Sequence, residues 1–190
     1  MPLFTSIFET LKQREPLPPL FPSAIWRPEL SSQISAATEA ELFNAQTIKS
    51  QSEAGMRDAC RAGLLLWNDD LEASHHIAQN IEDATGSFWH AIMHRREGDA
   101  ANSNYWWRKT GAHPAFDDVH RAALDLLKNE NDDEAHTFAA LLERSGTWQP
   151  SEFTARCAQS GTSTEDGLWL RRVQLAEMQA LLDWCQARIG

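Results

Sequence analysis

Apolar residues recur at steps of three and four positions from residue 52 onward, and this spacing restricts the fold more than any other feature. The clearest stripe consists of Met56, Ala59, Cys60, Gly63, Leu64 and Trp67. Residues at such steps share one face of an α-helix, whereas a half-buried strand needs strict alternation of apolar and polar residues. Sustained alternation is absent from the sequence. The spacing therefore predicts an all-α protein.

Capping residues and breaks divide this pattern into separate helices. Asp70 and Asp99 can each cap a helix after a short turn, and Ser87 can cap the helix between them. Thr38 and Glu41 have the spacing of a capping box. The helices expected from these signals cover residues 1–12, 52–67, 71–80, 87–97, 100–110, 151–160 and 168–188.

Two consecutive segments resemble each other as antiparallel helical hairpins. A shift of 29 residues aligns Ala62 with Ala91, Asp70 with Asp99 and Ser74 with Ser103. A looser third copy covers residues 119–144. Because the identities are few, ordinary antiparallel helix pairs in a bundle stay open beside a short TPR-like array.

Four prolines within residues 15–22 interrupt the helical pattern near the N-terminus. Proline removes backbone donors and disfavours helix, so we expect an extended arm whose apolar side chains pack on the body or on a partner. The sequence thus predicts two parts. Residues 1–50 are an N-terminal arm with short helices, and residues 51–190 are a single all-α domain.

Charge and composition exclude several classes of partner. The net charge of −10 argues against nucleic acid and anionic membranes, both of which attract cationic faces. No apolar run approaches the roughly 18–20 residues of a membrane span. The three cysteines form neither a disulfide framework nor a cysteine zinc site. We therefore expect a cytoplasmic protein without nucleic-acid or membrane partners.

Residues 86–114 contain three of the seven histidines, three of the eight tryptophans and the only tyrosine. On a helix, His90, His94 and Glu97 lie along one face, and imidazole and carboxylate groups bind zinc, iron or manganese. They are the candidate ligands of a divalent metal. Alternatively, these groups act as acid and base without a metal, or the histidines only hydrogen-bond buried polar groups.

The preceding helix offers one more histidine to this site. His75 joins it if the hairpins pack face to face, whereas adjacent His76 points about 100° away. A neighbouring carboxylate could orient His75 as a general base. The candidate catalytic residues are His75, His90, His94, Arg95 and Glu97.

A cluster of cations and aromatic residues predicts a pocket for an anionic small molecule. Arginine binds carboxylate or phosphate in a bidentate fork, and tyrosine and tryptophan can wall such a pocket. Asn102 and Asn104 could supply amides to a ligand or satisfy helix ends. The candidate ligand-binding residues are Arg96, Asn104, Tyr105, Arg108 and His113. Alternatively, the arginines form intramolecular pairs that the tryptophans cover.

Four segments are similar to an uncharacterised family of bacterial and fungal proteins. They read LWNDDLEASH at 66–75, GSFWHAIMHRRE at 86–97, NYWWR at 104–108 and GAHP at 111–114. The family pattern is a WHxxxHRREPD core followed by a YWxRRxGxHP-like segment, and the resemblance covers residues 58–186. It implies kinship without an activity, because no function is established for the family. Gly98 replaces the proline of the pattern, and His76 stands where a small polar residue is expected.

Two hypotheses follow for the function. The first is a small-molecule-binding protein or enzyme with a His/Arg/Glu/aromatic pocket, with or without a metal. The second is an interaction scaffold of helical hairpins, in which the same residues form a structural polar network. Burial distinguishes them, because a closed and satisfied network favours the scaffold, whereas a water-accessible cluster favours a binding site.

Overall fold

A computed structural model describes residues 2–44, 50–160 and 167–189 of the protein. These residues form eleven α-helices and no strand, so the prediction of an all-α fold is confirmed. The helices are α1 (Leu3–Lys12), α2 (Pro28–Ala36), α3 (Glu39–Phe43), α4 (Gln51–Trp67), α5 (Leu71–Ala78), α6 (Ala84–Glu97), α7 (Ala100–Thr110), α8 (Phe116–Leu127), α9 (Asp133–Ser145), α10 (Pro150–Gln159) and α11 (Leu168–Gln186).

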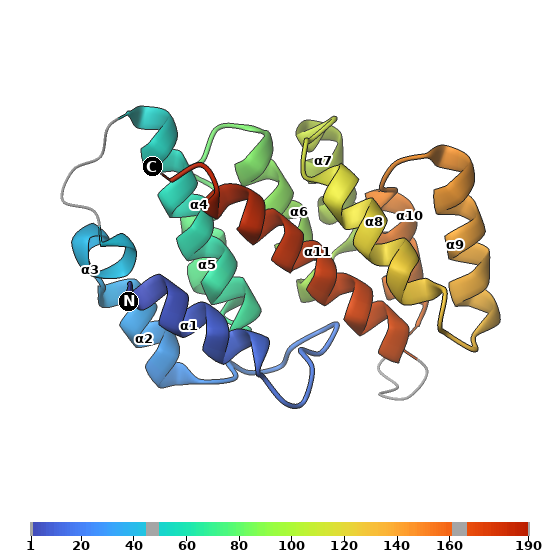
Figure 1. The fold of residues 1–190 in the computed structure, drawn as a ribbon, viewed down its shortest axis with the longest axis horizontal. Coiled ribbons are helices and arrows are strands. Elements are labelled where there is room, and N and C mark those ends of the chain that lie inside the picture. Colours follow the sequence, from blue (N-terminus) through green and yellow to red (C-terminus); the bar gives the residue numbers. More distant parts are fainter. Residues whose placement is uncertain (1, 45–49, 161–166, 190) are drawn as a thin grey trace.

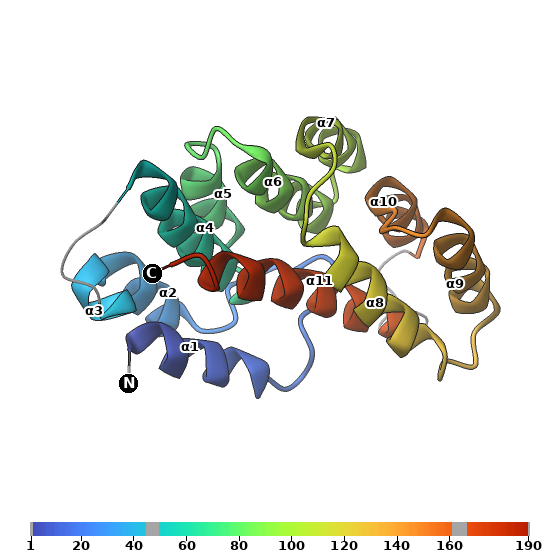
Figure 2. The same cartoon turned by 45° about the horizontal axis from the view of Figure 1, so that its top comes forward.

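The longest helix, α11, runs along the molecule and joins its two ends (Figure 1). Helices α1–α5 lie at one end and α8–α10 at the other, an arrangement that the turned view also shows (Figure 2). Helix α11 packs on α4 and on α8, and α6 packs most closely on α7. No helix in the described ranges has the length and apolar run needed to cross a bilayer.

Most of the predicted helix starts are found in the structure. The side chains of Asp70 and Asp99 each accept a hydrogen bond from the backbone three residues on, and Thr38 and Glu41 form a capping box. The predicted cap at Ser87 is wrong, because this residue lies inside α6. The carboxylate of Asp83 instead accepts bonds from the backbone N–H groups of the next turn, which starts the helix earlier.

The core is centred on Gly63, where α4, α6 and α11 approach one another. A Cβ atom at this position would lie 2.6 Å from Cζ2 of Trp89 and 2.9 Å from Cδ1 of Leu182. Both side chains are buried, so they fill the space that the missing methyl group leaves. Close packing of this kind requires glycine on α4.

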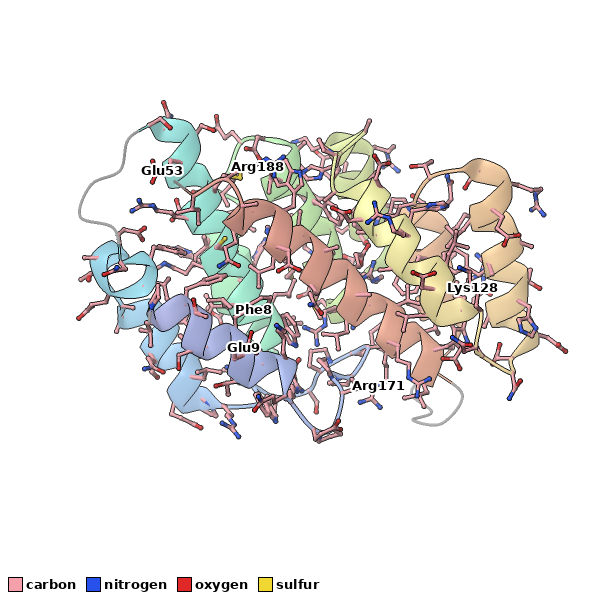
Figure 3. All side chains as sticks on the ribbon, viewed as in Figure 1. Phe8, Glu9, Glu53, Lys128, Arg171 and Arg188 are labelled. Atoms are coloured by element: carbon pink, nitrogen blue, oxygen red, sulfur yellow. The ribbon has the colours of Figure 1, made fainter. Side chains whose placement is uncertain are left out.

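The proline-rich segment between α1 and α2 is held to the body through its backbone carbonyl groups. Arg171, labelled in Figure 3 at the start of α11, donates to the carbonyl oxygens of Pro18 and Leu17. Gln174 donates to the carbonyl oxygen of Pro19 at 3.2 Å. Because proline leaves these carbonyls without helical partners, side chains of α11 take that place.

A buried group of charges lies beside this segment, in the turn between α4 and α5. The carboxylate of Asp69 forms ion pairs with both Arg14 and Arg96, and all three side chains are buried. Asp69 has a φ of 65°, in the left-handed region that few residues other than glycine adopt. The two ion pairs stabilise this unfavourable backbone conformation.

Two glycines of α4 give opposite predictions for the same substitution. Gly63→Ala is expected to lower the free energy of unfolding by about 1–3 kcal/mol, because the new methyl group overlaps Trp89 and Leu182. Gly55→Ala is expected to raise it by about 0.5–1 kcal/mol, since no described atom lies within 4 Å of the new Cβ and alanine favours helix. Urea denaturation measures both. Effects of the same sign would contradict the packing described for Gly63.

Removal of the charge at Asp69 is expected to destabilise the protein strongly. Asp69→Asn leaves two buried guanidinium groups without a carboxylate and should cost about 3–5 kcal/mol of unfolding free energy. The matched control is Asp125→Asn, which breaks an exposed pair with Lys128 and should barely move the urea midpoint. A small effect at Asp69 would show that this buried group does not hold the fold together.

Candidate metal centre

Three histidines from two helices converge on one point. His75 comes from α5, and His90 and His94 come from successive turns of α6. One ring nitrogen of each lies within 4.8 Å of the others. The ring of His75 meets the rings of His90 and His94 edge-on, with centroids 4.5 and 5.4 Å apart. The spacing of four residues on α6 and the packing of α5 against it create this arrangement.

Helix α7 packs two side chains against the histidine pair of α6. The indole of Trp106 stacks on the ring of His90, with centroids 3.8 Å apart and planes tilted by 16°. The amide nitrogen of Asn102 lies 3.1 Å from Nε2 and 3.3 Å from Nδ1 of His94. Nearly equal distances to both ring nitrogens place the amide against the face of the ring and outside its plane. Asn102 is therefore a polar neighbour of both ring nitrogens of His94.

Glu97 orients His94 and is not itself among the convergent ligand atoms. One carboxylate oxygen lies 3.0 Å from Nδ1 of His94, and the Glu97 side chain is exposed. A carboxylate at this distance favours the tautomer that carries its proton on Nδ1, which leaves Nε2 as the acceptor. The structure thus places Glu97 beside a candidate metal ligand and outside the group of convergent nitrogens.

The environment favours the neutral forms of His75 and His90. Burial is the main cause that lowers the pKa of His90 from 6.5 to about 3, and the charges of His75, His94 and Lys109 add to the effect. Burial also lowers the pKa of His75, with Glu97 opposing the shift. Neutral imidazole is the form that binds a metal, so these sites need not lose a proton at neutral pH.

His90 also has an unsatisfied polar atom. Its side chain is only 3% exposed, and Nδ1 has no hydrogen-bond partner among the described residues. Such an atom usually costs about 1–3 kcal/mol relative to a hydrogen-bonded one. A ligand bound to this nitrogen would therefore satisfy it without breaking a hydrogen bond to the protein.

The arginines expected in an anion pocket point away from the histidines. Arg95 forms a buried ion pair with Glu177, whose other oxygen accepts a bond of 2.9 Å from the indole of Trp148. Arg96 pairs with Asp69 and donates to the carbonyl oxygen of Leu66. These guanidinium groups are used within the fold, which corrects the expectation that they face a ligand.

Two further candidates lie away from the histidine cluster. Both nitrogens of His113 are used elsewhere, since Nδ1 accepts a bond from the backbone of Ala115 and Nε2 lies 3.3 Å from the hydroxyl of Thr85. Its ring packs against Trp184, and burial lowers its pKa to about 4. Arg108 is exposed and touches none of the cluster's rings in the described structure.

The remaining candidates lie on α7. Tyr105 is exposed and packs edge-on against Trp106, with centroids 5.4 Å apart. The side chain of Asn104 makes no contact with the histidines, whereas Asn102 does. The sequence suggested Asn102 as an amide donor to a ligand and tryptophan as a pocket wall, but it placed neither Asn102 nor Trp106 against the histidines. Their spacing of four residues, equal to that of His90 and His94 on the paired helix, is the signal that identifies them.

One surface groove lies next to the histidine cluster without enclosing it. It has a volume of about 770 Å³ and lies along α5, bordered by Ile25, Arg61 and Ile77 among others. Of the three clustered histidines, only His75 borders it. His75 therefore connects the histidine cluster to the groove.

Comparison of the chain with protein-family models, with curated proteins and with solved structures finds no match. The similarity of the motifs around His90 and Tyr105 to an uncharacterised family therefore stays a prediction.

The lowered pKa values give the protein a defined response to acid. Between about pH 6.5 and 4 the unfolded chain binds protons that His90 and His113 do not bind when folded, so unfolding becomes easier as the pH falls. Urea midpoints between about pH 7 and 5 should decrease, and His113→Asn should flatten the slope. The exposed His136→Asn is the control and should leave the slope unchanged. An unchanged slope in His113→Asn would contradict the assignment.

Proposed function

We propose that the protein binds a divalent transition metal through His75, His90 and His94. The convergence of three ring nitrogens from two helices is the observation that carries the proposal. Two of the three side chains are buried, and His75 is half-buried at the edge of the cluster. The sequence predicted His90, His94 and Glu97 as metal ligands, with His75 as a further candidate, and the proposal takes His75 as the third ligand in place of Glu97.

The donor set indicates which metals fit. Three neutral imidazoles suit zinc, cobalt, nickel or copper, whereas magnesium and calcium prefer oxygen ligands. A tetrahedral zinc with Zn–N bonds of about 2.0–2.1 Å requires nitrogens closer together than 4.8 Å. Binding of a tetrahedral zinc would therefore require the three side chains to move closer together.

Three protein ligands leave a coordination position for a small molecule or water. Metal sites with an open position are usually catalytic, whereas structural zinc sites have four protein ligands. A bound zinc polarises carbonyl or phosphoryl oxygens and lowers the pKa of water. We therefore propose a metal-dependent small-molecule-binding protein or enzyme of the hydrolytic class. The exposed carboxylate of Glu97 lies where it can accept a proton from a ligand at this position.

A second candidate function is a scaffold of helical hairpins, and the buried arginines favour it. Arg95 and Arg96 form buried ion pairs with Glu177 and Asp69, which a structural polar network would contain. The second helices α5, α7 and α9 each begin with an aspartate that caps the third backbone N–H group. These shared starts support a hairpin repeat over α4–α9. The convergence of three histidine nitrogens is the part that a scaffold does not explain.

Metal content tests the proposal directly. Protein purified without a histidine tag and reconstituted with zinc or cobalt should hold about one metal per chain, measured by elemental mass spectrometry. His90→Ala/His94→Ala should lose it, as should His75→Ala, which alters a half-buried side chain and disturbs the core least.

The control is His76→Ala/His136→Ala, which removes two exposed histidines outside the cluster and should keep the metal. Circular dichroism checks that each variant is folded. A wild type that binds no metal after reconstitution, or a metal that persists in folded His75→Ala, would overturn the proposal.

A further inference from the structure

We propose that the groove along α5 binds a small organic amine. Asp70 and Glu72 hold the ammonium group of this ligand, and its apolar body lies against Ile25 and Ile77. The inference goes beyond the proposed metal centre and stands whether or not the histidines bind a metal.

The groove has the size of a small-molecule site. Residues of the loop before α2, of α2, of α4 and of α5 border it, and its volume is about 770 Å³. Pockets for small molecules usually measure about 300–1,000 Å³. A protein partner would instead bury a broad surface of about 800 Å² on each side. The dimensions therefore favour a small organic ligand.

Apolar side chains form one part of the groove's border. Ile25 is 38% exposed, which is unusual for a large apolar side chain of this protein. Ala73 and Ile77 are four residues apart on α5, so they lie on the same face of the helix beside the groove. A ligand with an apolar body would remove the surface of Ile25 and Ile77 from water, and this favours binding.

Two carboxylates on the border of the groove lack a positive partner. Asp70 and Glu72 stand at the start of α5, and no ion pair between described residues includes either of them. Arg61 also borders the groove, but its guanidinium group pairs with Glu39 at 2.7 Å and donates to the carbonyl oxygen of Ile34. The groove therefore has unbalanced negative charge, which attracts a cation.

Asp70 is the more enclosed of the two carboxylates. The residue is only 9% exposed, and its Oδ1 accepts a bond of 3.1 Å from the backbone N–H group of Ala73. No described residue donates to Oδ2, so this oxygen can accept a bond from a ligand. Because the bond from Ala73 already orients the carboxylate, its side chain loses little freedom when an ammonium group binds.

The position of His75 relates the groove to the proposed metal centre. His75 borders the groove and also belongs to the histidine cluster. It lies five residues after Asp70, which corresponds to about 8 Å along a helix. If the cluster holds a metal, an amine bound in the groove is the class of molecule that would lie next to it.

The probe for the test is n-hexylammonium, with hexanol as its neutral analogue and hexanoate as its anionic analogue. Isothermal titration calorimetry is carried out on protein freed of metal with EDTA, at pH 8, where an alkylammonium group keeps its charge. The wild type should bind hexylammonium about tenfold more tightly than either analogue. Methylammonium should also bind more weakly, because it lacks the apolar body.

A double variant locates the binding. Asp70→Asn/Glu72→Gln removes both charges, and asparagine still caps α5, so hexylammonium should bind about tenfold more weakly while the fold is kept. The matched control is Asp132→Asn/Glu134→Gln, which changes the same cap position and the same spacing at the start of α9. The control should bind hexylammonium as the wild type does. Circular dichroism checks that each variant is folded.

The single variant Glu72→Gln changes an exposed side chain and decides the test if the double variant does not fold. It should bind hexylammonium about threefold more weakly than the wild type. A wild type that binds no hexylammonium, binds hexanoate equally well, or loses binding equally in both double variants would overturn the inference. Because the titrations use metal-free protein, that outcome would leave the proposed metal centre standing, and a failure to bind metal would leave the amine site standing.

Discussion

Two adjacent guanidinium groups, on Arg95 and Arg96 of α6, constrain how the rest of the molecule packs. Both side chains are essentially removed from water, and a buried charge without a partner is too costly to persist. Arg96 takes its carboxylate from Asp69 in the turn before α5, and Arg95 takes Glu177 from α11. These two ion pairs therefore fix the position of α6 between α11 and the turn before α5.

The ion pairs of Arg95 and Arg96 also fix the helix that carries two of the three histidines. Every residue from Thr85 to Arg96 is buried, so α6 is surrounded by protein along its length. Its arginines face α11 and the turn before α5, while His90 and His94 face α5 and α7. Because α6 is surrounded by protein, the backbone positions of its two histidines are fixed. A binding site built from several helices requires such fixed positions.

Local signals in the sequence predicted the helices well. Asp70, Asp99 and the pair of Thr38 and Glu41 act through atoms three residues away, so their sequence spacing is sufficient. The predicted start of α6 was wrong because two residues could cap this helix. The carboxylate of Asp83 accepts the backbone N–H groups of Thr85 and Gly86, so the helix begins before Ser87. Which of the two residues caps the helix depends on the preceding turn. There the backbone of Gly86 lies so close to Ile81 that no side chain fits at position 86.

The sequence predicted mainly those site residues that helical periodicity places on one face of a helix. His90 and His94 share a face because they are four residues apart, and His75 followed from the idea of face-to-face hairpins. The partners of Arg95 and Arg96 lie 82 and 27 residues away, so no local pattern showed that these charges are neutralised inside the fold. His113 is near the cluster in sequence, yet the turn after α7 carries it to Trp184 on α11.

The close and buried imidazoles of the histidine cluster have an energetic cost that a bound ligand would lower. Three imidazoles lie close enough that protonating one disfavours protonating another, and burial keeps His90 neutral, with a pKa near 3. Neutral rings present lone pairs, and Nδ1 of His90 has no donor to satisfy it in the described structure. A core that only needed to be filled would gain stability from apolar side chains at these positions. A bound cation would satisfy these lone pairs. This favours the proposed metal centre over a purely structural network.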